Sequence, residues 1–173
     1  MSEYLQPETV ALVDTNLFVA VGGPDNDKYR ALREYVENRD VSLKVPRRVE
    51  RELTTMHYAD RVQRAVDEGW AERIDPPSPT DPDAVSAMDF VRREIARRTG
   101  EDEHEVEKAD TALAGLAVEY LKRTDDPVAV VTDDRVAARA IEAGTARSEC
   151  EGSVSVFTRE DLIGGGGDDL RII

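Results

Sequence analysis

Cysteine, lysine and histidine are scarce in this sequence of 173 residues, and long apolar runs are absent. Cys150 is the only cysteine, so no disulfide can form within the chain, which is typical of intracellular proteins. No apolar run approaches the roughly 18 residues that cross a bilayer. Residues 1–7 also lack the basic start and apolar core of a secretory signal. We therefore expect a cytoplasmic protein with no membrane segment.

Only four of the 23 basic residues are lysines, which leaves 19 arginines, and 37 acidic residues give a formal net charge of −14. Acidic residues spread along the whole chain are typical of proteins from halophiles. In about 1 M salt the Debye length falls to about 3 Å, so global repulsion of a nucleic acid is largely screened. The charge therefore does not exclude a nucleic-acid substrate. The alternative is an ordinary acidic protein with no polyanionic partner.

Two familiar kinds of catalytic motif are missing as well. The glycine run at 164–167 has no following Lys-Ser or Lys-Thr, so it is not a phosphate-binding P-loop. His57 and His104 have no serine or cysteine partner in a recognisable nucleophile setting. His104 lies in the acidic tract 101–107, and such charge runs are usually solvated surface. We do not predict a primary metal site in that tract.

Short apolar segments alternate with helical patterns along the chain. We predict strands over 10–13, 41–45, 70–74, 128–131 and 154–157, with helices over 28–37, from 46 onward, over 84–98, over 103–123 and to about 143. Strands separated by helices predict an α/β fold, a three-layer sandwich with a mostly parallel sheet flanked by helices. Residues 1–163 then form one domain, and the glycine-rich joint and tail occupy 164–173.

Four carboxylates occupy positions that a parallel sheet would bring together at one edge. Asp14 directly follows the first apolar strand, and Asp134 closes the polar run after the most apolar strand. Asp133 competes with Asp134 for the same role. Glu52 lies about two turns into a helix that starts from a strand end, and Asp110 is embedded in a helix of small apolar residues. Ligands of such sheets gather beyond the carboxyl ends of the strands, where we expect these side chains to converge.

A close group of carboxylates needs a cation, since two unit charges 4 Å apart repel by about 4 kcal/mol at an effective dielectric constant of 20. Mg²⁺ and Mn²⁺ prefer oxygen ligands and keep several waters, so they suit such a group. A bound ion can polarise a phosphate and lower the pKa of a bound water. The pattern therefore predicts a magnesium or manganese site that serves phosphodiester hydrolysis.

The four acidic segments, in this order, resemble the PIN-domain nuclease family over residues 10–157. The motif Asp14-Thr15-Asn16 after a strand and the motif Thr132-Asp133-Asp134 after another are the strongest points. The resemblance implies a ribonuclease that uses one or two Mg²⁺ or Mn²⁺ ions, with Asp14, Glu52, Asp110 and Asp134 as ligands and Asp133 beside them. It also implies that Thr15, Asn16 and Thr132 support the carboxylates by hydrogen bonds.

The same family includes toxins that pair with antitoxin proteins. The family also includes RNA-processing enzymes, and this chain carries extra length around residues 76–105 compared with the compact toxin form, which argues against a toxin. Arg47, Arg48 and Arg51 could contact phosphates of an RNA substrate, although a solvated helix face explains them equally well. The apolar helix face over 113–120 could serve a homodimer or only the core.

Two rival functions come from other classes. The first is a phosphatase or phosphotransfer protein in which Asp14 is the nucleophile. Asn16 argues against the haloacid-dehalogenase-like version of it, because the motif of that family has a second aspartate at this position. The second is a PIN-like module that binds RNA or a protein without cutting. The complete acidic set favours the metal-dependent ribonuclease, with the antitoxin-controlled toxin as the alternative within that class.

Overall fold

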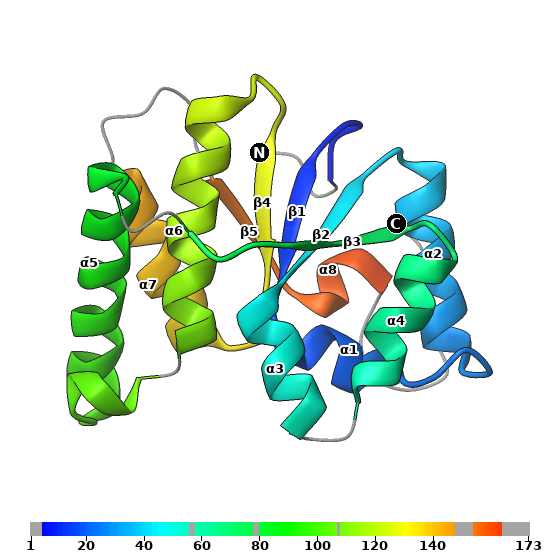
Figure 1. Ribbon diagram of the computed structural model, residues 1–173, viewed down its shortest axis with the longest axis horizontal. Coiled ribbons are helices and arrows are strands. Elements are labelled where there is room, and N and C mark those ends of the chain that lie inside the picture. The colour runs from blue at the N-terminus through cyan, green and yellow to red at the C-terminus, as the bar shows by residue number, and fades with distance from the viewer. Residues whose placement is uncertain (1–4, 56–57, 78–79, 107, 148–153, 164–173) are drawn as a thin grey trace.

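The computed structural model describes residues 5–55, 58–77, 80–106, 108–147 and 154–163. Within them, five strands form one parallel sheet in the order β3-β2-β1-β4-β5 (Figure 1). The strands are β1 (Val10–Val13), β2 (Ser42–Pro46), β3 (Ala71–Ile74), β4 (Val128–Val131) and β5 (Val154–Phe157). The predicted strands are all present, with bounds shifted by one residue for β2 and β3. The predicted joint and tail at 164–173 lie outside the described residues.

The two most apolar strands lie side by side in the middle of the sheet. Every residue of β1 and β4 is buried, and the pairing runs from Val10 opposite Val128 to Val13 opposite Val131. Strands covered on both faces read as continuous apolar runs rather than alternating ones. These two runs are therefore central because only central strands lose contact with water on both sides.

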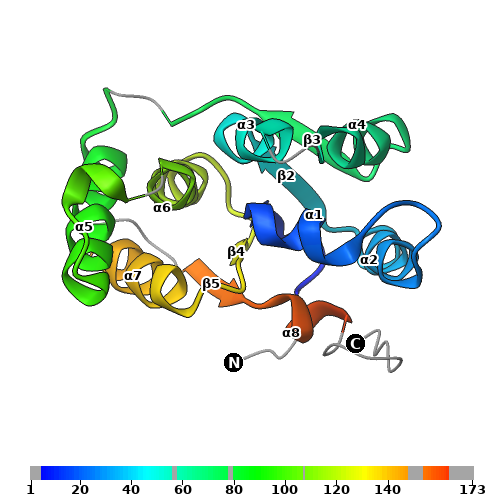
Figure 2. The ribbon, with the colours of Figure 1, turned by 90° about the horizontal axis from the view of Figure 1, so that it is seen from below.

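Helices cover both faces of the sheet, so the predicted three-layer α/β sandwich is confirmed. One face carries α1 (Thr15–Val21), α2 (Asp27–Asn38), α3 (Arg47–Thr55), α4 (Ala59–Asp67) and α8 (Arg159–Ile163), and the other carries α5 (Pro82–Thr99), α6 (Lys108–Arg123) and α7 (Arg135–Ala146) (Figures 1 and 2). Ala11 and Val13 point into the first core, while Leu12 points into the second. No described helix has the length and apolar character needed to cross a membrane.

The helix predicted over 103–123 begins later than expected. Residues Glu103–Glu105 form a short 3-10 turn, η1, and α6 starts only at Lys108. The Asp102 amide donates to Glu105 Oε2 at 3.1 Å, and this capping box closes the turn separately from α6. The prediction was wrong here because the side chains of Asp102 and Glu105 accept hydrogen bonds from backbone amides of the turn itself. As a result, Asp110 lies in the first turn of α6.

Much of the apolar face of α6 packs within the chain itself. Leu113 and Leu116 are buried in the chain's own core, where α6 packs against α5 and α7. Trp70 lies in the core of the opposite face, with 4% exposure. Its ring meets that of Tyr29 edge to face, with 5.4 Å between centroids.

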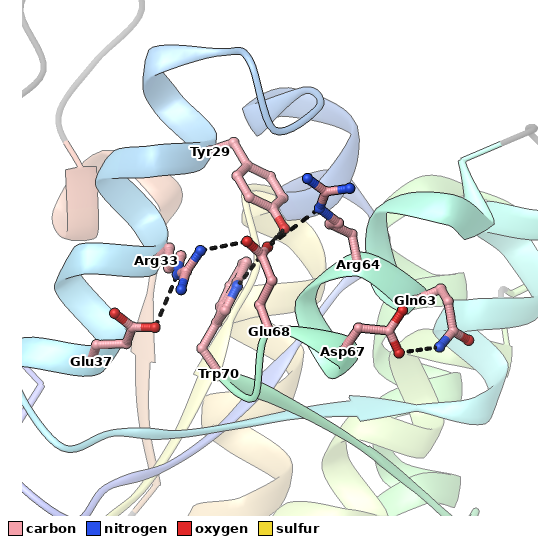
Figure 3. Close-up of polar contacts among 8 residues, drawn as sticks. All are labelled: Tyr29, Arg33, Glu37, Gln63, Arg64, Asp67, Glu68 and Trp70. Carbon is pink, nitrogen blue, oxygen red and sulfur yellow. Dashed lines mark hydrogen bonds and ion pairs between the residues drawn. The ribbon is translucent and has the colours of Figure 1, made fainter.

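A polar network around Glu68 holds α2 against the end of α4 and the start of β3 (Figure 3). The Glu68 carboxylate accepts the Tyr29 hydroxyl at 2.5 Å and the Trp70 indole N–H at 3.4 Å. It also pairs with the Arg33 guanidinium. Burial, with the hydrogen bond to Glu68, raises the pKa of Tyr29 well above its ordinary value of 10.0. The ionised carboxylate of Glu68 is therefore the hydrogen-bond acceptor for the Tyr29 hydroxyl and the Trp70 indole N–H, whose side chains are both buried.

Candidate active site

The strand order reverses direction between β1 and β4. From β1 the chain proceeds to β2 on one side, whereas β4 on the other side leads to β5. The carboxyl ends of both strands, together with α1, α3 and the start of α6, lie at the lower end of the sheet in Figure 1, which Figure 2 views directly. In parallel sheets this reversal point is where ligands bind. Asp14 follows β1 and Thr132 follows β4 at this place.

Hydrogen bonds join the two strand ends around Asp14, which is 6% exposed. Oδ2 of Asp14 accepts the Thr132 hydroxyl at 2.9 Å and the Asn16 amide at 3.2 Å. The backbone amide of Asp133 donates to Asn16 Oδ1 at 3.2 Å, and the backbone amide of Asp134 donates to the Thr132 hydroxyl oxygen at 3.2 Å. The two residues that donate to Asp14, Thr132 and Asn16, therefore each accept a hydrogen bond from the loop after β4. The carboxylate is fixed in one orientation before any ligand arrives.

Asp110 is the second buried carboxylate at this end of the sheet, with 7% exposure. Its neighbour Ala109 packs in the core shared by α1 and α3, whereas Leu113, one turn later, packs in the core of α5 and α7. The first turn of α6 therefore crosses the end of the sheet from one layer to the other. The helix dipole favours a carboxylate at this first-turn position.

Glu52 is placed by its helix, since its side chain lies outside the described part of the structure. The helix α3 starts where β2 ends and packs against α1 and α6. Its neighbours Val49 and Leu53 are fully buried, which fixes the orientation of α3. The side chain of Thr15 likewise lies outside the described part.

The two aspartates after β4 each hold a backbone group. Asp134 is exposed and is the N-cap of α7, where Oδ1 accepts the amides of Val136 at 2.9 Å and Ala137 at 3.0 Å. Oδ1 of Asp133 accepts the Arg159 amide at 2.7 Å, and Oδ2 lies 3.7 Å from Nε of Arg159. Asp133 thereby anchors the start of α8. Sequence reasoning did not find Arg159, because the contact depends on how β5 lies beside β4.

Among the described residues, one group of three potential metal ligands has its ligand atoms within 4.8 Å of one another: Asp102, His104 and Glu105. All three are exposed, and two of them form the capping box of η1. No three of Asp14, Asp110, Asp133 and Asp134 approach each other as closely in that part of the chain. An ion that binds carboxylates at the strand ends would keep some of its waters, as Mg²⁺ commonly does.

The three arginines of α3 have different surroundings. Arg47 pairs with Asp75 at 2.8 Å, and both side chains are exposed. Arg48 lines a cavity between α3, α5 and α6, whereas Arg51 lies exposed on the same helix. The sequence did not single out two further cations of that cavity, Arg92 and Lys108, although Lys108 stands only two residues before Asp110.

Comparison with known families identifies one match. The family model described as the halobacterial PIN domain matches residues 7–170, almost the whole chain. No curated protein matches the chain. The matched range includes both strand ends and every acidic position described above.

Proposed function

Since the chain belongs to the family of halobacterial PIN domains, we propose that it is a metal-dependent ribonuclease that hydrolyses RNA phosphodiester bonds. The observation that carries this proposal is the buried Asp14 at the reversal point of the sheet, held by Thr132 and Asn16. A buried carboxylate that is held in one orientation at the strand ends is suited to bind a cation. PIN domains are generally nucleases, and that family relation supports the same reaction class.

The donors at the strand ends are carboxylate oxygens, which fit Mg²⁺ or Mn²⁺. We propose Asp14, Glu52, Asp110 and Asp134 as the residues that hold the ion, with Asp133 beside them. When bound, such an ion lowers the pKa of a coordinated water and neutralises the leaving oxygen. Asp134 can take part although it caps α7, because both of its described hydrogen bonds use Oδ1.

The chain's own residues then have separate tasks. Thr132 and Asn16 hold Oδ2 of Asp14, which leaves the orientation of this carboxylate independent of the ligand. Asp110 brings a second buried charge from another layer of the fold. Thr15 belongs to the same proposed support through its place between Asp14 and Asn16. Such preorganised groups lower the barrier because they do not reorient during the reaction.

Replacing Asp14 with asparagine tests the proposal. The Asp14→Asn variant should lose RNA cleavage in Mg²⁺ and in Mn²⁺ while keeping its fold, and the metal-free variant should unfold at a higher temperature than the wild type. An amide can still accept from Thr132, and one buried negative charge is removed. Asp67→Asn is the control, since Asp67 bonds only Gln63 on the exposed face of α4 in the described structure.

Cleavage and thermal unfolding are measured together for wild type, Asp14→Asn and Asp67→Asn, each with Mg²⁺, Mn²⁺ or EDTA. The control variant should cut like the wild type, which shows that one lost surface charge has no effect. Wild-type cleavage that survives EDTA, or an Asp14→Asn protein that cuts normally with Mn²⁺, would refute the proposed chemistry.

A further inference from the structure

A cavity of about 640 Å³ lies between α3, α5 and the start of α6, and we refer to it as the basic groove. Arg48, Arg92 and Lys108 line it from these three helices, together with His104. Glu103 is the one acidic residue among the described lining residues. An excess of positive charge is unusual in a chain with a formal net charge of −14.

Two other cavities show how unusual this charge is. A cavity of about 690 Å³ beside β3 and the end of α6 carries four carboxylates against three cations, and one of those cations, Lys122, already bonds Asp81 and Asp83. A cavity of about 300 Å³ beside Trp70 is lined by three carboxylates and no cation among its described residues. The positive charge of the basic groove is therefore a local feature rather than a sample of the surface.

The cations of the basic groove are available to an anion. Among the described residues, Arg92 has one ion-pair partner, Asp89 on its own helix at 3.1 Å, and both side chains are more than a third exposed. Exposed pairs of this kind are weak, so a phosphate can replace the carboxylate. Within the described residues, Arg48 and Lys108 form no ion pair.

The basic groove also has an apolar lining. Met88 and Pro77 lie against α6 at Gly115, where an added Cβ would be 2.6 Å from the Met88 sulfur and 3.0 Å from Cγ of Pro77. Glycine at this position therefore lets both side chains lie directly on the helix. A flexible thioether beside a proline ring suits the face of an aromatic ring. The basic groove thus combines donors for phosphate with a surface for a base.

The position of the basic groove connects it with the acidic site. Lys108 and Thr111 flank Asp110 in the first turn of α6, and Arg48 lies on the helix that carries Glu52. A chain whose scissile phosphate reached Asp110 would place its neighbouring nucleotides in the basic groove. The far wall belongs to α5, within the extra length that the sequence showed around residues 76–105.

We propose that the basic groove binds the segment of single-stranded RNA next to the scissile bond, with Arg48, Arg92 and Lys108 on its phosphates and Met88 against a base. This inference rests on the proposed ribonuclease function and adds how the substrate is held. Positively charged grooves with stacking surfaces are the usual way to bind single strands without a sequence requirement. A duplex would keep its bases stacked on each other and away from Met88.

Binding is tested in the Asp14→Asn protein without metal, so that no cleavage interferes. The probe is a fluorescently labelled oligouridylate, and its Kd is measured by anisotropy over a series of KCl concentrations at which the protein stays folded. Arg92→Gln and Lys108→Gln should each weaken binding about threefold to tenfold. The slope of log Kd against log salt should differ from that of the parent by about 0.7 for each phosphate contact removed.

Arg93→Gln is the matched control, since Arg93 is exposed on α5 next to Arg92 but does not line the basic groove. It should leave both Kd and slope unchanged. Equal effects of Arg92→Gln and Arg93→Gln, an unchanged slope in Lys108→Gln, or equal losses for an RNA duplex would overturn the proposal. Absence of any oligouridylate binding by the parent would overturn it too.

A separate cleavage assay on proteins that retain Asp14 distinguishes this proposal from the ribonuclease function. If Arg92→Gln and Lys108→Gln bind and cut like the wild type, the basic groove proposal fails while the function stands. If the wild type does not cut but Asp14→Asn loses oligouridylate binding through these substitutions, the ribonuclease function fails and the basic groove stands.

Discussion

The hydroxyl of Thr132 donates a hydrogen bond to Oδ2 of Asp14 at 2.9 Å, although the two residues are 118 positions apart in the chain. The bond joins the ends of the two central strands. It forms because β1 and β4 pair in register up to Val13 and Val131, so the residues that follow them meet at one edge. Thr132 therefore links the ends of the two central strands and also orients a carboxylate of the proposed active site.

Thr132→Val removes this donor with little change of shape. We expect the variant to need about 10- to 100-fold more Mn²⁺ for half-maximal cleavage, because Asp14 loses one of the hydrogen bonds that orient Oδ2. Thr132→Ser keeps the hydroxyl and should restore most of the affinity. The measurement is cleavage rate against Mn²⁺ concentration.

Thr145→Val is the control for loss of a buried threonine hydroxyl. Thr145 is 5% exposed and donates to the Ile141 carbonyl at 2.7 Å, within α7. This variant should leave the Mn²⁺ requirement unchanged even if stability falls. Equal Mn²⁺ requirements for Thr132→Val and wild type would remove Thr132 from the proposed site.

Glu68→Gln should destabilise the protein by about 1–3 kcal/mol near neutral pH, because Arg33, Tyr29 and Trp70 lose a partly buried, charged partner. The Tyr29 hydrogen bond, together with the Trp70 and Arg33 contacts, lowers the pKa of Glu68 below its ordinary value of 4.5. A lowered carboxyl pKa stabilises the fold fully above that ordinary value, and the stabilisation is lost as pH falls through the folded pKa. The wild type and Glu68→Gln should therefore converge in acid.

Urea unfolding of both proteins over a pH series measures this difference. Glu37→Gln is the control, because Glu37 is an exposed partner of the same Arg33, and exposed pairs contribute only about 0–1 kcal/mol. A stability difference between wild type and Glu68→Gln that persists unchanged at low pH would mean that the charge of Glu68 is not its source.

Much of the fold follows from apolar patterning, and the exceptions have physical reasons. The buried runs ending at Val13 and Val131 are long enough and apolar enough to be central strands. The polar segment before α6 has helical composition, but the capping box between Asp102 and Glu105 closes it as a separate turn. The helices α1, α4 and α8 were not predicted because they are short, with 7, 9 and 5 residues, and depend on tertiary packing.

The candidate site, too, has features that the sequence predicts and features that it does not. Positions after strands can be predicted, since the sheet topology brings their backbones together. Side-chain partners cannot, because they depend on registers and helix orientations that a single sequence does not state. The bond from the Arg159 amide to Asp133 and the pair of Arg47 with Asp75 are both of this kind.

Cleavage should increase from dilute to molar KCl. Most nucleic-acid binders lose affinity steeply as salt rises, but here a formal net charge of −14 opposes both folding and RNA approach. Screening relieves both, because the Debye length falls to about 3 Å at 1 M. The measurement is the cleavage rate over a KCl series, with unfolding followed in parallel.

Sucrose is the control for the salt series, since it stabilises folded proteins without screening charge. It should restore folding in dilute buffer without raising the rate of the folded fraction as KCl does. Greatest activity at low salt, in a protein that stays folded throughout, would contradict the expectation of a halophilic enzyme.

The last prediction separates two roles of Asp134, which caps α7 and is a proposed metal ligand. Serine is also a good N-cap, so Asp134→Ser should keep the stability of α7, whereas Asp134→Ala should lose about 1 kcal/mol. Both variants lack the carboxylate, and both should need at least about tenfold more Mn²⁺ for cleavage. Asp133→Ser loses the acceptor of the Arg159 amide, so we expect mainly a stability loss through α8. Thermal unfolding and Mn²⁺ titrations of the three variants distinguish the two roles. An Asp134→Ser protein that cuts like the wild type at every Mn²⁺ concentration would leave Asp134 as a helix cap only. The role of metal ligand would then belong to Asp133 if the Asp133→Ser protein needs more Mn²⁺ than the wild type.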